Sequence, residues 1–341
     1  MKVIRLEEPG RFALLSAKQP AVASIQPDEA MVRVHRVGVC GTDIHAFKGR
    51  QPFFNYPRVL GHELGVEVIE VGASVKNVKP GDLCAVEPYF HCRRCIACRR
   101  GKPNCCVDLQ VLGVHVDGGM REIVVVPSEK LHPSGKLLPD QLALVETLAI
   151  GCHAVKRAQP VAREFVLVVG IGPIGLGVVL FAVKAGAEVI VLDLDPKRLE
   201  FCRTRFGVAH LINASSEDPL QTLGQITGGD LPTAVFDATG NPQSMAGAFQ
   251  YPAHGGRVIL VGLFSGDITF NDPNFHRREL TLLASRNALS EDFTSVMNLL
   301  ETGAIDIMPW ITHRSRLDGV LREFPNWTQS NAGVLKAMIE V

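Results

Sequence analysis

Residues 164–195 constrain the fold of this chain more than any other stretch. Their sequence, EFVLVVGIGPIGLGVVLFAVKAGAEVIVLDLD, predicts a buried strand, a glycine-rich turn, a helix beginning at Pro173–Ile174 and a second strand that ends near Asp193. Further apolar runs follow in HLINAS, TAVFDATG, GRVILVGL and ELTLLAS, separated by helical or turn-rich segments. Strands that alternate with helices in this way predict an α/β domain with a doubly wound, parallel sheet.

The glycines of the turn add a prediction about binding. Gly170, Gly172 and Gly175 have the GxGxxG spacing, in which the first makes a tight turn, the second lets the backbone approach a pyrophosphate, and the third allows the helix to pack closely on the strand. Asp193 would accept hydrogen bonds from an adenosine ribose and repel a 2′-phosphate. The expected cofactor is therefore NAD rather than NADP; the alternative is a Rossmann-like unit that binds no cofactor.

The first 125 residues or so have a different pattern. Apolar and polar residues alternate in EAMVRVHRVGV, and GVEVIEVG, LCAVEP and REIVVVP predict further strands separated by turns. From about residue 290 the sequence predicts a helix, connectors and a closing strand. A length of 341 residues suits two domains better than one.

Five of the nine cysteines lie between Cys92 and Cys106. The spacing Cys92-x2-Cys95-x2-Cys98-x7-Cys106 suits a tetrahedral structural zinc site. The first three also match the start of an iron–sulfur run, but seven residues instead of three precede the fourth and no second set follows, which favours zinc. Because a closed four-sulfur site has no open position for a substrate, we expect the chemistry elsewhere.

Composition excludes several classes of partner. The formal net charge is zero, so no summed field attracts nucleic acid or an anionic membrane. The first residues lack the apolar core of a signal peptide, and no apolar run approaches the ~20 residues that span a bilayer. The odd number of cysteines argues against a complete disulfide framework. We expect a cytoplasmic protein that binds neither nucleic acid nor membrane.

A second group of metal-binding residue types lies in VGVCGTDIHAF and VLGHELGV. It comprises Cys40, Thr42, Asp43, His45, His62 and Glu63. From spacing alone two interpretations stay open: a second metal site, or a core cysteine beside ordinary capping and turn residues.

The motifs CGTDIH, GHE, the cysteine knuckle and GxGxxG, in this order, resemble the zinc-dependent medium-chain dehydrogenase/reductase family over essentially the whole chain. The resemblance implies a GroES-like, β-rich catalytic domain over residues 1–150, with a structural-zinc lobe at about 88–108. It implies an NAD-binding Rossmann domain over 151–288 and a C-terminal segment, 289–341, that returns to the catalytic domain. It also implies a homo-oligomer, either a tetramer or a dimer.

The resemblance assigns two zinc ions per chain. Cys40, His62 and Glu63 match the catalytic-zinc ligands of polyol and threonine dehydrogenases, and Glu146 matches a glutamate that either binds this zinc or holds its water. Asp43 matches the carboxylate that orients a ligand histidine. The structural zinc would be held by Cys92, Cys95, Cys98 and Cys106, with Cys105 as the spare cysteine.

The reaction implied is hydride transfer from an alcohol. Zinc lowers the pKa of the substrate hydroxyl, Thr42 takes its proton and passes it through the nicotinamide ribose to His45, and the hydride goes to the nicotinamide. The family's cofactor positions add Ile174, Arg198, Thr239, Gly262 and Leu263. Arg198 has the alternative of a solvated charge on a helix.

Three stretches, QPFFNYPRVLGHE, VLGVHVDGGM and LLASRNA, resemble bacterial dehydrogenases of sugar acids such as L-galactonate. We therefore expect oxidation of a secondary hydroxyl of a sugar acid or polyol to a ketone, with Arg50, His115 and Arg286 as candidate partners of a substrate carboxylate. One alternative is a dehydrogenase of L-threonine or of a simple secondary alcohol. Another is a non-catalytic, NAD-responsive zinc protein, against which the complete set of Cys40, His62 and Glu63 argues.

Overall fold

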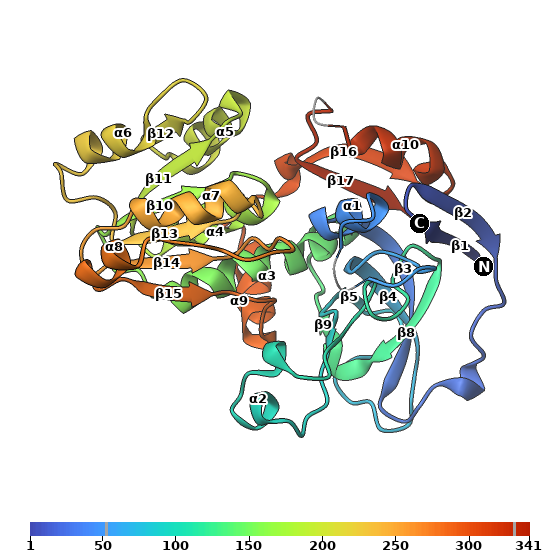
Figure 1. Cartoon of the computed structure of the whole chain (residues 1–341). Helices are drawn as coiled ribbons and strands as arrows, with labels where there is room; N and C mark the ends of the chain where they lie inside the picture. The colour runs from blue at the N-terminus through green and yellow to red at the C-terminus, as the bar shows by residue number, and fades with distance from the viewer. Residues whose placement is uncertain (52–53, 330–331) are drawn as a thin grey trace. The chain divides into compact units, whose positions relative to one another are not determined.

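The structure is a computed structural model that describes residues 1–51, 54–329 and 332–341 (Figure 1). The chain forms two compact units, the first made of residues 1–147 together with 288–341 and the second of residues 148–287. The C-terminal segment therefore belongs to the same unit as the N-terminal part of the chain. Helix α3 (Pro139–Ala158) runs across the first boundary.

The first unit is built on a seven-stranded sheet in the order β16-β17-β3-β4-β5-β9, with β8 also paired to β3. All pairs are antiparallel except β16 with β17. The alternation seen in the sequence buries Val32 and Val34 and leaves Arg33 exposed. The strands are β3 (Glu29–Val39), β4 (Glu63–Val71), β5 (Leu83–Val86), β8 (Ile123–Pro127), β9 (Leu131–Pro133), β16 (Ile311–Arg316) and β17 (Lys336–Glu340).

Two ribbons and several helices complete this unit. The ribbons pair β1 (Lys2–Glu8) with β2 (Arg11–Ser16) and β6 (Tyr89–Phe90) with β7 (Gln110–Val111). The helices are α1 (Gly41–Phe47), α2 (Ile96–Arg99), α9 (Ser290–Glu301) and α10 (Val320–Trp327), with short 3-10 turns at Val22–Ser24, Pro103–Cys105, Ser128–Lys130, Met308–Trp310 and Leu317–Gly319. Phe324 of α10 packs on Phe12 and Phe47, at ring distances of 5.0 and 5.2 Å, which attaches α10 to β2 and α1.

The second unit is a six-stranded parallel sheet in the order β12-β11-β10-β13-β14-β15. In chain order the sheet therefore starts at β10, runs outward to β12, and then returns to the other side of β10. The doubly wound sheet predicted from the sequence is confirmed. Its strands are β10 (Phe165–Val169), β11 (Glu188–Asp193), β12 (His210–Asn213), β13 (Ala234–Asp237), β14 (Arg257–Leu260) and β15 (Thr281–Ala284).

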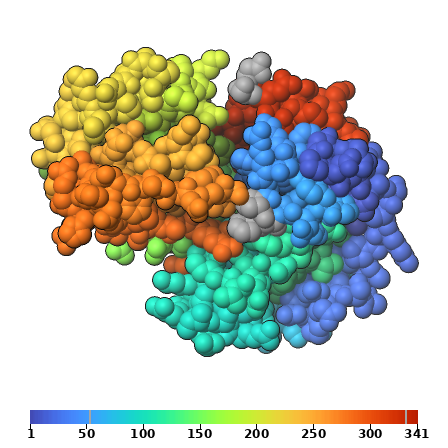
Figure 2. Space-filling model, viewed as in Figure 1, coloured from blue at the N-terminus to red at the C-terminus, as the bar shows by residue number. Residues whose placement is uncertain are grey.

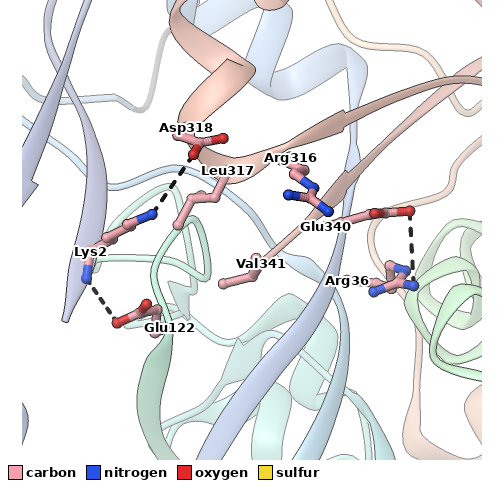
Figure 3. Close-up of a pocket in the computed structure, with 8 residues that line it drawn as sticks. All are labelled: Lys2, Arg36, Glu122, Arg316, Leu317, Asp318, Glu340 and Val341. Carbon is pink, nitrogen blue, oxygen red and sulfur yellow. Dashed lines mark hydrogen bonds and ion pairs between the residues drawn. The ribbon is translucent and has the colours of Figure 1, made fainter.

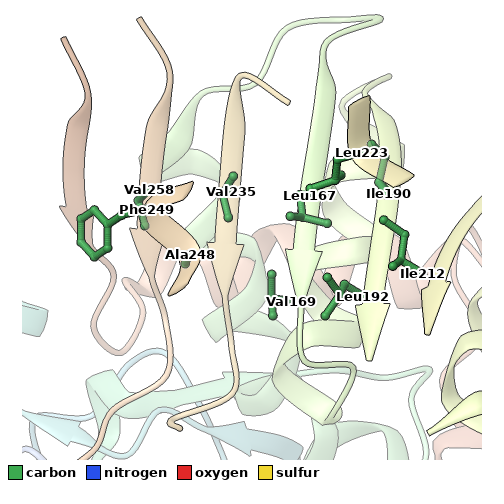
Figure 4. Packing of buried hydrophobic residues seen from close by; sticks show 10 residues of the cluster. All are labelled: Leu167, Val169, Ile190, Leu192, Ile212, Leu223, Val235, Ala248, Phe249 and Val258. Atoms are coloured by element: carbon green, nitrogen blue, oxygen red, sulfur yellow. The ribbon is translucent and has the colours of Figure 1, made fainter. Parts of the chain in front are cut away.

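The helices of the second unit cover the sheet and build its core. They are α4 (Pro173–Lys184), α5 (Pro196–Phe206), α6 (Pro219–Ile226), α7 (Pro242–Gly247) and α8 (Asp272–Arg277), with a 3-10 turn at Ala248–Gln250. On one face of the sheet, side chains such as Leu167, Ile190 and Val235 pack against Leu223 and Phe249 (Figure 4). Strands covered on both faces are continuous apolar runs, which is why FVLVV and EVIVLD were recognisable in the sequence.

The sheet reverses its direction of growth between β10 and β13. In open α/β sheets, ligands bind beyond the carboxyl ends of the strands at this switch point. The fold thus directs attention to the turns after Val169 and Asp237. Among the helices in the described residues, none has both the length and the apolar character that a bilayer crossing requires.

The first unit also contains a polar crevice of about 350 Å³, lined by Lys2, Arg36, Glu122, Arg316, Leu317, Asp318, Glu340 and Val341 (Figure 3). Two of its cations already have anionic neighbours, with Lys2 3.7 Å from Asp318 and Arg36 3.9 Å from Glu340. The residues that line it include none of the site residues predicted from the sequence. The candidate functional residues therefore lie outside this crevice.

Candidate functional site

The cysteine knuckle brings four sulfur atoms together. The Sγ atoms of Cys92, Cys95, Cys98 and Cys106 all lie within 4.8 Å of one another. Helix α2 begins directly after Cys95 and carries Cys98, and the turn at Pro103–Cys105 returns the chain to Cys106. Backbone N–H groups of Cys98 and Val107 lower the pKa of Cys95 to about 6, which favours the thiolate that binds metal ions. The arrangement fits a closed tetrahedral zinc site.

The knuckle lies at the surface, in the teal part of the chain in Figure 2. Arg93 connects it to the rest of the first unit through an ion pair of 3.0 Å with Glu129, and Arg99 donates a hydrogen bond to the carbonyl of Arg94. Cys105 is exposed and does not belong to the group of four sulfurs. Arg93 and Arg99 therefore have protein partners of their own.

A second group joins Cys40, His62 and Glu63, whose potential ligand atoms also lie within 4.8 Å of one another. Strand pairing explains why residues distant in sequence meet, because β3 ends just before Cys40 and its Gly38 pairs with Glu63 at the start of β4. His62 and Glu63 are buried, with 5% and 0% of their surfaces exposed. A thiolate, an imidazole and a carboxylate suit zinc, and three protein ligands leave a fourth position open.

The carboxylate of Asp43 faces the Nδ1 atom of His62. One carboxylate oxygen of Asp43 accepts the Cys40 N–H at 2.9 Å, and the other lies 3.7 Å from His62 Nδ1. Neither that oxygen nor Nδ1 has a hydrogen-bond partner among the described residues, although both are buried. A carboxylate facing the outer nitrogen of an imidazole is the usual way in which a metal-binding histidine is oriented. These residues therefore fit a metal ion bound at the opposite nitrogen of His62.

Burial shapes the charges of this pair. It raises the pKa of the Asp43 carboxyl, because the ionised form loses its hydration. Burial alone would lower the pKa of His62, but the charges of Asp43 and Cys40 together outweigh it and hold the pKa of His62 well above its ordinary value. The surroundings of the imidazole thus favour a positive charge, whether a proton or a metal ion supplies it.

Glu146, on α3, belongs to the same cluster of charges. It is 5% exposed, and one of its oxygens accepts a hydrogen bond from the phenol of Tyr89, which is equally buried on β6. Burial raises the pKa of Glu146, and the charges of His62 and Glu63 also act on it. Glu146 is not one of the three residues whose ligand atoms converge, so the structure separates it from Cys40, His62 and Glu63.

Two buried residues of this cluster were not anticipated from the sequence. Tyr89 is one, and Lys336 on β17 is the other, with its ammonium group 2.7 and 2.8 Å from the two carboxylate oxygens of Glu63. Burial opposes ionisation of Glu63, but Lys336 and then His62 outweigh it and lower the pKa of this carboxyl. A lysine in a closing strand and a tyrosine before a cysteine knuckle carry no spacing that would have identified them.

Thr42 and His45 lie three residues apart on α1 and therefore share one face of the helix. Thr42 is half-buried, whereas His45 is exposed. Partial burial, Arg50 and Lys48 together lower the pKa of His45. The imidazole is thus neutral, and able to accept a proton, over a wider range of pH than an ordinary histidine.

In the second unit, the predicted glycine turn follows β10 and precedes α4. Gly170 has a φ of +86°, and a Cβ on Gly175 would overlap with the carbonyl oxygen of Gly170, so the helix packs closely on the turn. A Cβ on Gly172 would meet nothing within 4 Å, and no side chain caps the helix there. Free helix N–H groups facing open space fit a pyrophosphate.

Asp193 ends β11 beside this turn. One of its oxygens accepts the Ile171 N–H at 2.6 Å and the other accepts the Asp195 N–H at 2.9 Å. The carboxylate is thereby fixed next to the glycine turn and keeps lone pairs for further donors. Arg198 lies on the first turn of α5, and its guanidinium group is 3.8 Å from the carboxylate of Asp195. Arg198 therefore has an ion-pair partner within the protein.

Other predicted cofactor residues follow β13 and β14. The backbone N–H and the hydroxyl of Thr239 donate to Asp237 at 2.9 and 2.6 Å. A Cβ on Gly262 would overlap with the backbone of Gly240, so the turns after the two strands lie against each other. Leu263 is 61% exposed, and Ile174 is half-buried at the start of α4.

The three basic residues considered for a substrate carboxylate lie in different places. Arg50 is exposed and follows α1, where its charge acts on His45. The Nδ1 atom of His115 accepts the Val111 N–H at 3.1 Å. Arg286 is exposed and belongs to the second unit. Pro52 and Phe53, within the stretch QPFFNYPRVLGHE, lie outside the described residues.

Comparisons with known proteins agree with this geometry. Residues 26–140 match the alcohol dehydrogenase GroES-like domain, and residues 173–302 match the zinc-binding dehydrogenase family. The chain is 42% identical over 322 residues to the L-galactonate-5-dehydrogenase of Escherichia coli K12, with 94% of each chain covered.

Solved structures extend the likeness to the whole fold. A crystal structure of a short chain alcohol dehydrogenase from E. coli CFT073, complexed with NADH, has a TM-score of 0.91 at 30% identity and covers 100% of this chain and 99% of that one. A zinc-binding dehydrogenase from Sinorhizobium meliloti 1021, bound to NADP, has a TM-score of 0.91 at 28% identity, with the same coverage. Family models and relatives together support zinc and a nicotinamide cofactor. The chain therefore belongs to the zinc-type medium-chain dehydrogenases, oxidoreductases that act on alcohols, and is close to the sugar-acid dehydrogenases among them.

Proposed function

We propose that this protein is a zinc- and NAD-dependent dehydrogenase that oxidises a secondary hydroxyl of an L-galactonate-like sugar acid, or of a polyol, to a ketone. The observation that carries the proposal is the buried convergence of Cys40, His62 and Glu63, with Asp43 behind the imidazole. The 42% identity to a dehydrogenase of L-galactonate supports the substrate class. The first unit would then be the catalytic domain and the second unit the cofactor domain.

Each group of ligands would hold one zinc ion. The knuckle holds a structural ion, and Cys40, His62 and Glu63 hold the catalytic one, with Glu146 either binding it or holding its water. When bound, the catalytic zinc stabilises the alkoxide form of the substrate and the nicotinamide accepts the hydride. Asp43 keeps His62 in the orientation that binds metal, and Tyr89 fixes the carboxylate of Glu146 through its hydrogen bond.

Thr42 and His45 would carry the proton. Thr42 would accept the proton from the substrate hydroxyl while its own hydroxyl proton passes through the ribose of the bound nicotinamide cofactor to His45. His45, at the exposed end of the same helix face, would deliver it to solvent. The lowered pKa of His45 keeps the imidazole able to accept a proton near neutral pH.

The cofactor would be NAD, because Asp193 presents a fixed negative charge where a 2′-phosphate would otherwise lie. The test is to measure kcat/KM with NAD and with NADP in Asp193→Ala. We expect the preference for NAD to shrink at least tenfold, about 1.4 kcal/mol. Glu200→Gln, which removes a carboxylate of α5 that pairs with Arg203, is the matched control and should leave the preference unchanged. A wild type that uses both cofactors equally well would contradict this assignment.

The substrate class is tested by comparing L-galactonate with galactitol, which lacks the carboxylate, and with L-threonine, while following NADH formation. We expect L-galactonate to be preferred, and Arg50→Ala or His115→Gln to lower its kcat/KM by about 1.5–3 kcal/mol if either side chain holds the carboxylate. Equal rates with galactitol would show that the carboxylate is not recognised and would leave only the broader assignment to a zinc- and NAD-dependent dehydrogenase. Turnover of L-threonine alone would favour a threonine dehydrogenase, and no turnover with any substrate would favour a non-catalytic protein. That the protein is a homo-oligomer stays a prediction, which a measurement of its molar mass by light scattering would test.

A further inference from the structure

Lys336 is a fully buried cation next to the candidate catalytic site. Its side chain is 1% exposed, and its ammonium group donates to both oxygens of Glu63, to the hydroxyl of Thr147 at 3.2 Å and to the carbonyl of Val39 at 3.3 Å. A buried lysine is costly unless it is paired and its hydrogen bonds are made. Here the pairing is complete, and the partner is one of the three converging residues of the metal group.

The carboxylate of Glu63 also lies against Gly38, which has no side chain. Gly38 pairs with Glu63 across β3 and β4, and a Cβ on Gly38 would overlap with Glu63 Oε2. Its φ is not positive, so backbone conformation does not require a glycine here. The space beside Gly38 is therefore the niche in which the Glu63 carboxylate lies, with Lys336 as its donor.

The groups around Lys336 are mostly acidic. Glu63 from β4, Glu146 from α3 and Cys40 before α1 all act on it electrostatically. The imidazole of His62 and the buried phenol of Tyr89 also belong to this set, because each acts on Glu63 or Glu146. The buried carboxylate of Asp43 belongs to it as well, because it lies 3.7 Å from His62 Nδ1 and Glu63 acts on it. When these acidic groups are ionised they carry more negative charge than a divalent ion offsets, and Lys336 is a buried positive charge that reduces the excess.

We propose that Lys336 is a positioning residue of the catalytic metal site: it holds Glu63 in the Gly38 niche and balances the negative charge of the ligands. This inference rests on the proposed function. It makes β17, a strand far along the chain from the ligand motifs, part of the catalytic apparatus. Lys336 touches neither substrate nor cofactor in this account and acts only through Glu63.

The consequence of removing the charge is specific. In Lys336→Met, Glu63 loses its cationic partner, and the site becomes more anionic. A divalent ion is then bound more tightly, because a nearby repulsive charge is gone. The same ion receives more negative charge from its ligands and is a weaker acid toward the substrate hydroxyl. Turnover should fall although metal binding does not.

The experiment uses the whole protein substituted with Co²⁺, whose visible bands report ligand number and geometry. In Lys336→Met we expect shifted bands, a Co²⁺ dissociation constant at least tenfold lower in chelator competition, and kcat/KM about 10–100-fold lower, with the acid limb of its pH profile moved to higher pH. Lys336→Arg keeps the charge and should restore the position of the limb. Gly38→Ala keeps Lys336 but displaces the carboxylate, so the bands should shift in this variant too.

Lys130→Met is the matched control, because Lys130 forms an equally buried ion pair with Glu87 in the same unit and is 3% exposed. It should lose stability without shifting the cobalt bands or the acid limb. If Lys336→Met behaves like Lys130→Met, or binds Co²⁺ more weakly with an unchanged limb, Lys336 is only structural and the inference is wrong. If the wild type shows only the bands of a four-sulfur site, the catalytic metal site itself fails.

Discussion

The two cysteine-containing groups of the first unit use the same chemistry in opposite surroundings. The knuckle is a surface loop, in which Cys92, Cys95 and Cys98 keep part of their surface exposed and every converging ligand is a sulfur. The group of Cys40, His62 and Glu63 is buried, mixed in ligand type, and surrounded by further ionisable residues. The two groups therefore differ in ligand type, in ligand number and in burial.

The difference lies in what each group leaves free. Four sulfurs satisfy a tetrahedral ion completely, so the knuckle can only hold its loop together. Three mixed ligands leave a position open, and their neighbours, Asp43 and Lys336, fix imidazole and carboxylate without filling that position. Supporting residues around a site, rather than the ligands themselves, indicate that it is built for chemistry.

The largest expected effect comes from opening the knuckle. Cys95→Ser removes a sulfur that lies 3.5 Å from Cys98 and 3.9 Å from Cys106. Loss of a structural metal should lower the free energy of unfolding by more than about 4 kcal/mol. Denaturant unfolding and metal analysis are the measurements. A variant that keeps wild-type stability would show that the knuckle is dispensable and would remove the contrast with the second group.

His62→Ala tests the second group, formed by Cys40, His62 and Glu63. We expect the fold to persist while kcat/KM falls a hundredfold to a thousandfold, because a ligand of the open site is lost. This fall corresponds to a loss of about 3–4 kcal/mol of transition-state stabilisation. Metal analysis should show one zinc ion per chain in place of two. Circular dichroism and thermal unfolding report on the fold, and near-normal turnover would refute the catalytic assignment.

The charges near each group should also behave differently. Arg50 lowers the pKa of His45, so Arg50→Ala should raise this pKa and move the acid limb of kcat/KM for alcohol oxidation to higher pH. The sign follows because oxidation needs a neutral imidazole, which is lost as the pH falls through its pKa. The measurement is a pH–rate profile. A limb that stays in place in Arg50→Ala would mean that it reports another group, such as the substrate hydroxyl at the metal, and not His45.

The smallest effect is expected at the knuckle's own arginine. The ion pair of Arg93 with Glu129 has side chains 58% and 46% exposed. Exposed pairs contribute about 0–1 kcal/mol, so Arg93→Gln should change the free energy of unfolding by no more than that and leave the acid limb unmoved. A larger loss in urea unfolding would mean that the arginines, and not only the sulfurs, hold the loop in place.

Sequence patterns predicted the fold well because its signals are local. The continuous apolar strands, the glycine turn after Val169 and the spacing of the knuckle are readable within short windows. The order of the parallel sheet then follows from the general rules for α/β proteins. The assignments of individual site residues stay predictions until variants are measured.

The residues that support the candidate catalytic site were not predictable in this way. Lys336 begins a strand whose next three residues are apolar, and Tyr89 precedes the knuckle without a motif of its own. Their importance depends on pairings between distant strands, which a single sequence does not reveal. For His115, the bond from Val111 shows a role in its own turn that a search for basic residues near a substrate had not considered.

The distance along the chain between the parts of each group also sets an order of assembly. The sulfurs of the knuckle come from residues 92–106, so closing that loop costs little entropy and a metal ion can bind it early. Lys336 reaches Val39 across 297 positions, with the whole second unit in between. Contacts of such separation form late in folding. During synthesis, the proposed structural ion can therefore bind long before the candidate catalytic site is complete, and a fragment of residues 1–147 would lack the charge of Lys336.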